Sequence, residues 1–354
     1  MTEPGILKLT TYFAERERAG GRFLTDALLD LYEDRRVATS IVLRGIAGFG
    51  PHRVVRTDES LSLSEDLPVA IVATDTAEVI GPVVDEAVVL MRHGLVTVER
   101  AESAVTRLTD GDVRLGVYLG RRQRSRGAPA YLAVTDLMHR LGFAGVIVYL
   151  GVDGTTGQQR RRAKFFSRNT DVPVLVLAVG TAGQAGAAAA ELARLEPGPQ
   201  LTVERIRICK RAGRLLSPPP SLPATDAAGL GLFQKLTVFT DEDDRHDGQP
   251  IHRALVRRLR GDGHAGGATV LRGLWGFTGA GEPHGDRMFA LGRRVPVATV
   301  IIDTPAGIAR SFEIVDELTT GHGLVTCETV PAMLTLDGDQ RFGGTTLARL
   351  PFNQ

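Results

Sequence analysis

The sequence is poor in cysteine and has no long apolar run. Cys209 and Cys327 are the only cysteines in 354 residues, too few and too far apart for a disulfide framework or a zinc-thiolate site. No apolar stretch reaches the roughly eighteen residues that a membrane-spanning helix needs, and the N-terminus has no basic segment followed by an apolar one. We therefore expect a cytoplasmic protein that is neither secreted nor inserted in a membrane.

An excess of charge of one sign is also missing. Lysine and arginine number 42 against 41 acidic residues, which gives a formal net charge of +1 and provides no general attraction for a polyanion. Two arginine runs, Arg121–Arg126 and Arg160–Arg168, stand out, with only Phe165-Phe166 as nearby aromatic residues. Because a nucleic-acid interface needs stacking or base-reading groups along a basic stripe, we expect solvated loops. The alternative is a surface for an acidic protein partner.

Motifs of catalysis are missing as well. The sequence has no Gly-x-Ser-x-Gly, His-Glu-x-x-His or Cys-x-x-Cys, and neither a P-loop nor a Rossmann fingerprint. We predict no catalytic residue, no metal site and no resident cofactor, and we do not expect an enzyme.

The chain does contain an internal repeat, which is the main signal in the sequence. Four motifs of its first part recur in the same order in its last part. The pairs are Lys8-Leu9-Thr10 with Lys235-Leu236-Thr237, Leu43–Phe49 with Leu271–Phe277, Pro68-Val69-Ala70 with Pro296-Val297-Ala298, and His93–Thr97 with His322–Thr326. Such order and spacing do not arise by chance.

A more divergent copy lies between these two. Val172–Leu177 resembles Leu67–Val72, and Leu201–Glu204 resembles Val96–Glu99, but the pattern Gly-x-x-Gly-Phe that begins at Gly45 is changed after Gly151. We divide the chain into unit 1 (5–106), unit 2 (112–208), a proline-rich linker (209–232), unit 3 (233–334) and a C-terminal tail (335–354). The tail is expected to add an edge strand or to be disordered.

Hydrophobic periodicity predicts the elements of one copy. Strand-like runs cover 6–13, 40–43, 68–73 and 95–98, and apolar residues at helical spacing cover 23–31 and 80–91. Asp75 and Asp303 are expected to cap helices. The order βαββαβ is that of a ferredoxin-like α+β unit. Because one such unit buries little of its surface, we expect three to pack about a pseudo-threefold axis, so that a monomer acts as a trimer.

The motifs Leu43–Gly50, Leu63–Val69 and Gly94–Thr97 together resemble the PII-like family of uncharacterised bacterial proteins, which is related to PII signal transducers. Units 1 and 3 resemble it along their whole length, and unit 2 only in outline. The resemblance implies a signalling or regulatory protein built as a trimer. It also implies an adenine nucleotide in the clefts between units and a partner such as a membrane transporter or channel.

The topology itself suggests a site for a small anionic ligand. The glycine-rich run after the second strand and the turn before the fourth strand lie at the same end of a βαββαβ sheet. Glycines there can expose backbone amides to a phosphate, and arginines can pair with its oxygens. The candidate ligand-binding residues are Arg44, Gly45, Gly48, Phe49, Gly50, Arg92, His93 and Gly94 in unit 1, and Arg272, Gly273, Gly276, Phe277, His322 and Gly323 in unit 3.

Several alternatives stay open. The glycines could serve only a bulge and a helix stop, and Phe49 could stack on a base or pack on the neighbouring unit. His93 and His322 could contact ligand, act as a pH switch or be solvated. Because unit 2 has changed its glycine motif, we expect fewer than three sites, the best of them built from units 1 and 3. A scaffold that binds partners without a small ligand is the alternative function.

Overall fold

The structure is a computed structural model that describes residues 5–58, 66–103, 110–161, 172–263, 265–279, 281–285 and 295–350. Within these ranges the fold is mixed α/β, dominated by strands, with six α-helices. Most of the second arginine run, with Phe165-Phe166, and the start of the motif Leu63–Val69 lie outside the described residues.

The elements follow the order expected from the sequence. Unit 1 contains β1 (Ile6–Ala14), β2 (Arg18–Ala19), β3 (Arg22–Phe23), α1 (Leu24–Asp34), β4 (Thr39–Phe49), β5 (Arg56–Thr57), β6 (Pro68–Thr76), α2 (Ala77–Leu90) and β7 (His93–Ala101). Unit 2 contains β8 (Asp112–Gly120), β9 (Arg124–Ser125), β10 (Ala128–Pro129), α3 (Ala130–Arg140), β11 (Gly145–Leu150), β12 (Gly154–Thr156), β13 (Gln159–Arg160), β14 (Pro173–Thr181), α4 (Ala182–Leu192), β15 (Gln200–Arg211) and β16 (Arg214–Leu215). Unit 3 and the tail contain β17 (Phe233–Asp241), β18 (Arg245–His246), β19 (Gln249–Pro250), α5 (Ile251–Asp262), β20 (Ala268–Arg272), β21 (Trp275–Thr278), β22 (His284–Gly285), β23 (Pro296–Asp303), α6 (Pro305–Leu318), β24 (Leu324–Val330), β25 (Ala332–Asp337) and β26 (Gln340–Gly344).

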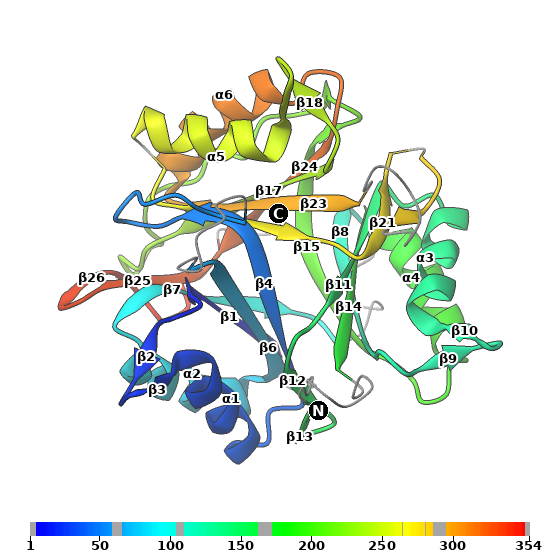
Figure 1. Ribbon diagram of the computed structural model, residues 1–354, viewed down its shortest axis with the longest axis horizontal. Helices are drawn as coiled ribbons and strands as arrows, with labels where there is room; N and C mark the ends of the chain where they lie inside the picture. The colour runs from blue at the N-terminus through cyan, green and yellow to red at the C-terminus, as the bar shows by residue number, and fades with distance from the viewer. Residues whose placement is uncertain are drawn as a thin grey trace.

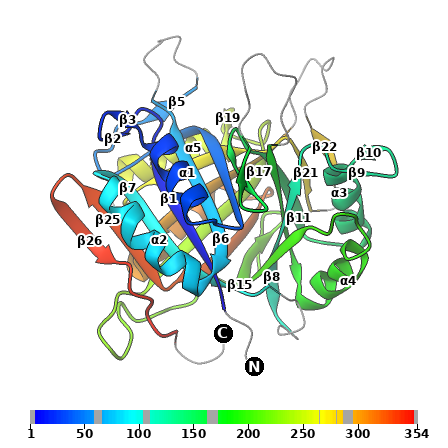
Figure 2. The ribbon, with the colours of Figure 1, turned by 90° about the horizontal axis from the view of Figure 1, so that it is seen from below.

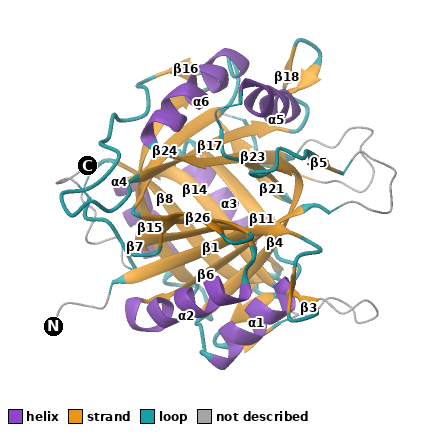
Figure 3. Cartoon of the chain, turned by 90° about the vertical axis from the view of Figure 1, so that its left-hand side faces the viewer, coloured by secondary structure: helices purple, strands orange, loops and turns teal. Residues whose placement is uncertain are grey.

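The helices lie outside and the strands inside. Figure 1 shows three helix pairs, α1 with α2, α3 with α4 and α5 with α6, around a central mass of strands, and Figure 3 shows the same layering from the side. In each unit the four main strands are antiparallel and adjacent in the order second, third, first, fourth. These orders are β4–β6–β1–β7, β11–β14–β8–β15 and β20–β23–β17–β24.

Extensions of the second strands join the units. In unit 1 the strand does not end at the glycine-rich run, as the sequence suggested, but continues as β4 to Phe49 and pairs with β20 of unit 3. The corresponding strand β21 of unit 3 pairs with β11 of unit 2, and β12 of unit 2 pairs with β4 of unit 1. The three contacts therefore run from unit 1 to 3, from 3 to 2 and from 2 to 1.

The fourth strands make a second set of contacts between units. β15 also pairs with β24, an isolated bridge joins Glu102 to Val203, and β25 pairs with β7. The expected linker thus begins as strand, since β15 reaches Arg211. Of the alternatives for the tail, an added strand is the one observed: β25 and β26 form a hairpin that joins unit 3 to unit 1, as Figure 2 shows.

Each helix pair covers its own apolar core. Three clusters of buried residues lie between helices and sheet, and a fourth contains side chains from all three units, among them Ile41, Ile147 and Leu271. The strand extensions also contribute side chains to neighbouring cores. Phe49 of unit 1 is buried in the core of unit 3, and Phe277 of unit 3 is buried in the core of unit 2.

A ring of six charged side chains is buried among the first and fourth strands of the units. Each unit supplies one cation and one carboxylate from equivalent positions. Around the ring, Lys8 contacts Glu99 and Glu204 at 2.9 and 2.6 Å, and Lys235 contacts Glu99 and Glu328 at 2.5 and 2.9 Å. Arg114 closes the ring, 2.5 Å from Glu328 and hydrogen-bonded to Glu204. Cations and carboxylates alternate, so the ring has no net charge.

The buried ring makes the stability of the fold depend on pH in the acidic range. Burial alone would raise the pKa of Glu99, but Lys235, Lys8 and Arg114 outweigh it and hold that pKa well below its usual range. Burial would also raise the pKa of Glu204, but Arg114 and Lys8 outweigh it, so this pKa is lowered as well. A lowered carboxyl pKa stabilises the fold above the unfolded-state value of about 4.3, and that contribution is lost as the pH falls through the folded-state pKa.

Arg160, expected in a solvated loop, instead joins unit 2 to unit 1. Its side chain is only 15% exposed and contacts Asp26 at 2.8 Å and Asp30 at 2.5 Å on α1, as well as Asp153 at 2.8 Å beside β12. The guanidinium therefore fixes β12 and β13 against the first helix of the neighbouring unit.

Replacing Arg160 by glutamine is expected to lower the free energy of unfolding by about 1–2 kcal/mol, because three carboxylates lose a charged donor at a partly screened site. Urea denaturation measures this, and the loss should shrink in high salt. Arg161→Gln is the matched control, because the neighbouring guanidinium contacts Gln159 at the surface. Equal midpoints for the two variants would contradict the assignment.

In the described part of the chain, no helix combines the length and the apolar character needed to cross a bilayer.

Candidate functional site

A cavity of about 560 Å³ lies between units 1 and 3. Unit 1 contributes the end of β1, the end of β4 with the turn after it, and the start of β7. Unit 3 contributes the start of β20 and the end of β23, and the β25–β26 hairpin, which leads from unit 3 into the tail, completes the lining. The lining includes Tyr12, Glu17, Gly48, Phe49, Gly50, His52, Arg53, Arg56, His93, Gly94, Thr269, Asp303, Met333, Thr335 and Phe342.

The structure brings both predicted segments of unit 1 to this cavity. Of the predicted residues, Gly48, Phe49, Gly50, His93 and Gly94 line it. Arg44, Gly45 and Arg92 do not: Arg44 pairs with Glu15 at 2.7 Å on the surface. The arginines that do line it, Arg53 and Arg56, were missed because they follow the recognised motif. Their signal in the sequence was their place just after the glycine run.

The predicted residues of unit 3 lie elsewhere. Gly276 and Phe277 belong to β21, which pairs with unit 2, and the Phe277 ring meets His139 edge-on at 5.0 Å between centroids. Arg272 is hydrogen-bonded to Glu242. Gly273, His322 and Gly323 are likewise absent from the lining of the cavity. The two predicted sets therefore occupy two different junctions between units.

The glycine pairs are explained by close packing of strands. A Cβ at Gly48 would lie 2.6 Å from the carbonyl oxygen of Ala268, and one at Gly276 would lie 2.0 Å from that of Val146. Unit 2 keeps the same spacing, with Gly151 and Gly154. Gly45 and Gly48 are strand residues without positive φ, so the run is not a loop at these two positions. Whether they also contact ligand stays a prediction.

The aromatic residue of the motif packs on the neighbouring unit. Phe49 is 6% exposed within the core of unit 3, so packing, not stacking on a base, is the alternative that fits. In unit 2 the corresponding residue is Thr155, whose hydroxyl hydrogen-bonds to Ser40 Oγ at 3.0 Å. The loss of phenylalanine there reflects a polar contact between units.

Asp75 and Asp303 are not the capping residues. Thr76 and Thr304 hold the N-cap positions of α2 and α6. The Asp303 carboxylate, which lines the cavity, accepts hydrogen bonds from the amides of Gly266 at 3.0 Å and Thr304 at 2.6 Å. It thereby ties the end of β23 to the segment before β20.

His93 and His322 have matching partners. His93 Nδ1 lies 3.1 Å from Glu17 Oε1, and His322 Nδ1 lies 3.3 Å from Asp244 Oδ1. In units 1 and 3 the acid follows the first strand and the histidine precedes or begins the fourth, so the pair lies at one end of the sheet. The histidines are 44% and 49% exposed, and neither is a core residue.

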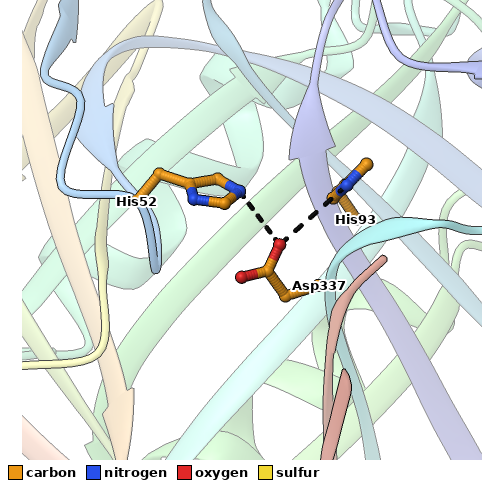
Figure 4. A group of neighbouring side chains, drawn as sticks. All are labelled: His52, His93 and Asp337. Atoms are coloured by element: carbon orange, nitrogen blue, oxygen red, sulfur yellow. Dashed lines mark ion pairs between the residues drawn. The ribbon is translucent and has the colours of Figure 1, made fainter. Parts of the chain in front are cut away.

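Two further polar side chains, those of His52 and Asp337, lie near His93 at the mouth of the cavity. Asp337 Oδ1 lies 2.9 Å from His52 Nε2 and 3.9 Å from His93 Nε2 (Figure 4). Asp337 comes from β25 of the tail, whereas both histidines belong to unit 1. His52 and Asp337 had no place in the sequence prediction, because they are distant from His93 along the chain.

Comparisons with known proteins agree with the repeat. A UPF0166 protein of Aquifex aeolicus (strain VF5) is 35% identical over 96 residues, which are 27% of this chain and 88% of that protein. The crystal structure of aspartate kinase from Synechocystis matches 94% of this chain but spans 45% of the kinase, with 11% identity and a TM-score of 0.25. A score that low carries no argument about fold or activity.

The model of the family DUF190 (Uncharacterized ACR, COG1993) matches the chain three times, over residues 6–103, 112–208 and 233–332. These matches fall on the three units and span most of the sequence. The chain is therefore a member of this uncharacterised PII-like family, with three copies of the family domain in tandem.

Proposed function

We propose that this protein is a PII-like regulatory protein in which three ferredoxin-like units form a pseudo-trimer within one chain. It binds a small anionic ligand, an adenine nucleotide, in the cleft between units 1 and 3. In its ligand-bound state it regulates a partner such as a membrane transporter or channel. It is not an enzyme.

The observation that carries the proposal is the cavity between units 1 and 3. Its volume of about 560 Å³ falls within the range of roughly 300–1,000 Å³ usual for small-molecule sites. Both units line it, so a ligand there contacts both and favours the arrangement that binds it best. Such coupling of a cleft to the packing of units is what a regulatory protein requires.

The chemistry of the walls supports a polar ligand with an aromatic part. Arg53 and Arg56 place positive charge on the unit 1 side, and Tyr12 and Phe342 offer ring surface. Arg56 lies 3.6 Å from Asp66, a loose contact that an anion with better geometry can replace. The three junctions differ in sequence, because unit 2 has Thr155 where units 1 and 3 have Phe49 and Phe277, and unit 3 has no histidine at the position of His52. This difference supports fewer than three sites.

Thermal denaturation with ATP, ADP, AMP and cyclic AMP at millimolar concentration tests the ligand. A nucleotide at about 100 times its dissociation constant stabilises the fold by about 2.7 kcal/mol, so the melting temperature should rise for at least one of them. The absence of any shift in melting temperature would contradict nucleotide binding. If the protein captures its partner equally well with and without nucleotide, the scaffold function is favoured instead.

Gly50→Trp should abolish that shift while the protein still folds. A Cβ at Gly50 meets no atom within 4 Å, and the residue lines the cavity, so an indole there occupies ligand space without crowding the backbone. Gly5→Trp is the matched control, since Gly5 is also uncrowded and precedes the opposite end of β1. If the nucleotide-induced shift in melting temperature is lost in both variants, or in neither, ligand binding in the cleft between units 1 and 3 is contradicted.

A further inference from the structure

We propose that His52, His93 and Asp337 bind one divalent transition-metal ion at the mouth of the cavity between units 1 and 3. Glu17 positions His93 for this role. The inference does not depend on which small molecule, if any, the cavity holds.

The distances suit a metal ion. The three potential ligand atoms all lie within 4.8 Å of one another, with His52 Nε2 and His93 Nε2 at 2.9 and 3.9 Å from Asp337 Oδ1. A tetrahedral zinc ion with bonds of about 2.0–2.1 Å holds its ligand atoms about 3.3 Å apart. The observed separations bracket that value, so small rotations of partly exposed side chains complete the site.

The orientation of His93 is already fixed. Its Nδ1 faces Glu17 Oε1 at 3.1 Å, which leaves Nε2 directed toward Asp337, and Figure 4 shows both rings turned to this carboxylate. A carboxylate that accepts the Nδ1 hydrogen is the usual support of a metal-binding imidazole, because it fixes the tautomer and raises the basicity of Nε2.

The backbone brings the three ligands together from unit 1 and the C-terminal tail. Asp337 lies directly opposite His93 in the register of β25 and β7. The turn that carries His52 is held to unit 3, since Arg53 donates hydrogen bonds to the carbonyls of Arg260, at 3.1 Å, and Gly263 at the end of α5. The ion would therefore link unit 1 to the C-terminal hairpin.

The equivalent junction of unit 3 lacks the other ligands. His322 and Asp244 reproduce the pair His93 and Glu17. The residue that lies against the backbone of His322 is Gly213, in the turn between β15 and β16, and it has no ligand side chain. The sequence at the position of His52 is Gly279-Ala280-Gly281. One site with two histidines and an aspartate is therefore expected per chain, and His322 supplies a matched control.

The donor set indicates the class of ion. Two imidazoles and one carboxylate favour zinc and its first-row neighbours over magnesium or calcium, which prefer all-oxygen sites. Three protein ligands leave a coordination position for water or for a ligand atom, and both histidines line the cavity. Zn²⁺ and Co²⁺ are the suitable probes.

Binding of Zn²⁺ alone to the tag-free full-length chain tests the proposal. Equilibrium dialysis and titration calorimetry should give one ion per chain, and Co²⁺ should give the visible absorption of a low-symmetry site with nitrogen and oxygen ligands. His93→Gln and His52→Gln should each abolish saturable binding, whereas His322→Gln should leave affinity and stoichiometry unchanged. Melting curves without metal should coincide for all four proteins, since the three histidines are exposed.

Glu17→Gln separates positioning from ligation. It should keep the stoichiometry of one but weaken Zn²⁺ binding by about 10–100-fold, the usual cost of losing the support of a metal-binding histidine. Failure of the wild-type chain to bind Zn²⁺ saturably would overturn the proposal. So would equal binding by the His93→Gln and His322→Gln variants.

Discussion

Replacing Arg114 by methionine is expected to lower the free energy of unfolding by about 3–5 kcal/mol, the cost of leaving a buried charge without its partner. Arg114 is 5% exposed and contacts Glu204 and Glu328. Without it the ring keeps two cations and three carboxylates, in a place that water does not reach. Methionine is unbranched and adds no polar group, so the effect reports the loss of the charge together with its hydrogen bonds to Glu204 and Glu328.

Urea denaturation of Arg114→Met measures this loss, with Arg205→Met as control. Arg205 lies on β15 and its side chain is 46% exposed, so its replacement should change stability by no more than about 0.5 kcal/mol. The double variant Arg114→Met with Glu328→Gln restores a neutral ring and should be more stable than the single variant. A single variant as stable as the control would show that the ring contributes little.

The ring also shows what the sequence could reveal. The correspondence of Lys8 with Lys235, and of Glu99 with Glu204 and Glu328, follows from aligning the repeats. Polar residues in the middle of apolar strands are a signal of buried pairing. The sequence does not indicate that the six side chains meet, because that depends on how three sheets face one another.

The order of the elements in each unit was predictable from hydrophobic periodicity, and the contacts between units were not. Periodicity reports which face of a strand is buried but not which strand covers it. The continuation of β4 through Gly45 to Phe49 escaped prediction because glycine usually ends a strand pattern. An added strand was one of the two alternatives for the tail, but its pairing with β7 escaped prediction because nothing local in the tail identifies the strand that it joins.

The candidate site was predictable in part for the same reason. Gly48 to Gly50 and His93 belong to one unit, so the topology of that unit sufficed to place them at one end of the sheet. Asp337 comes from the tail and Thr269 from unit 3, so their place in or beside the cavity needs the arrangement of the units. The unit 3 candidates do not line this cavity, because the repeat transfers a position within a unit and not the neighbour that it faces. Whether they bind a ligand stays a prediction.

Gly154→Ala is expected to lower the free energy of unfolding by about 3–5 kcal/mol, combining backbone strain with overpacking. Gly154 has φ +153°, and a Cβ there would lie 2.2 Å from the carbonyl oxygen of Ser40. That oxygen belongs to β4, which pairs with β12. Neither backbone can withdraw without breaking the contact between units 2 and 1.

Urea denaturation of Gly154→Ala should be read against Gly157→Ala. Gly157 also has positive φ, +57°, but a Cβ there meets no atom within 4 Å. The control therefore carries backbone strain of about 1–2 kcal/mol without the crowding. Hydrogen exchange at Thr155, whose amide donates to Ser40 Oγ at 3.0 Å, should accelerate only in Gly154→Ala. If the two variants lose equal stability, the pairing of β12 with β4 does not require glycine at position 154. The repeated Gly-x-x-Gly spacing would then need another explanation, and ligand contact at Gly48 would be the first to test.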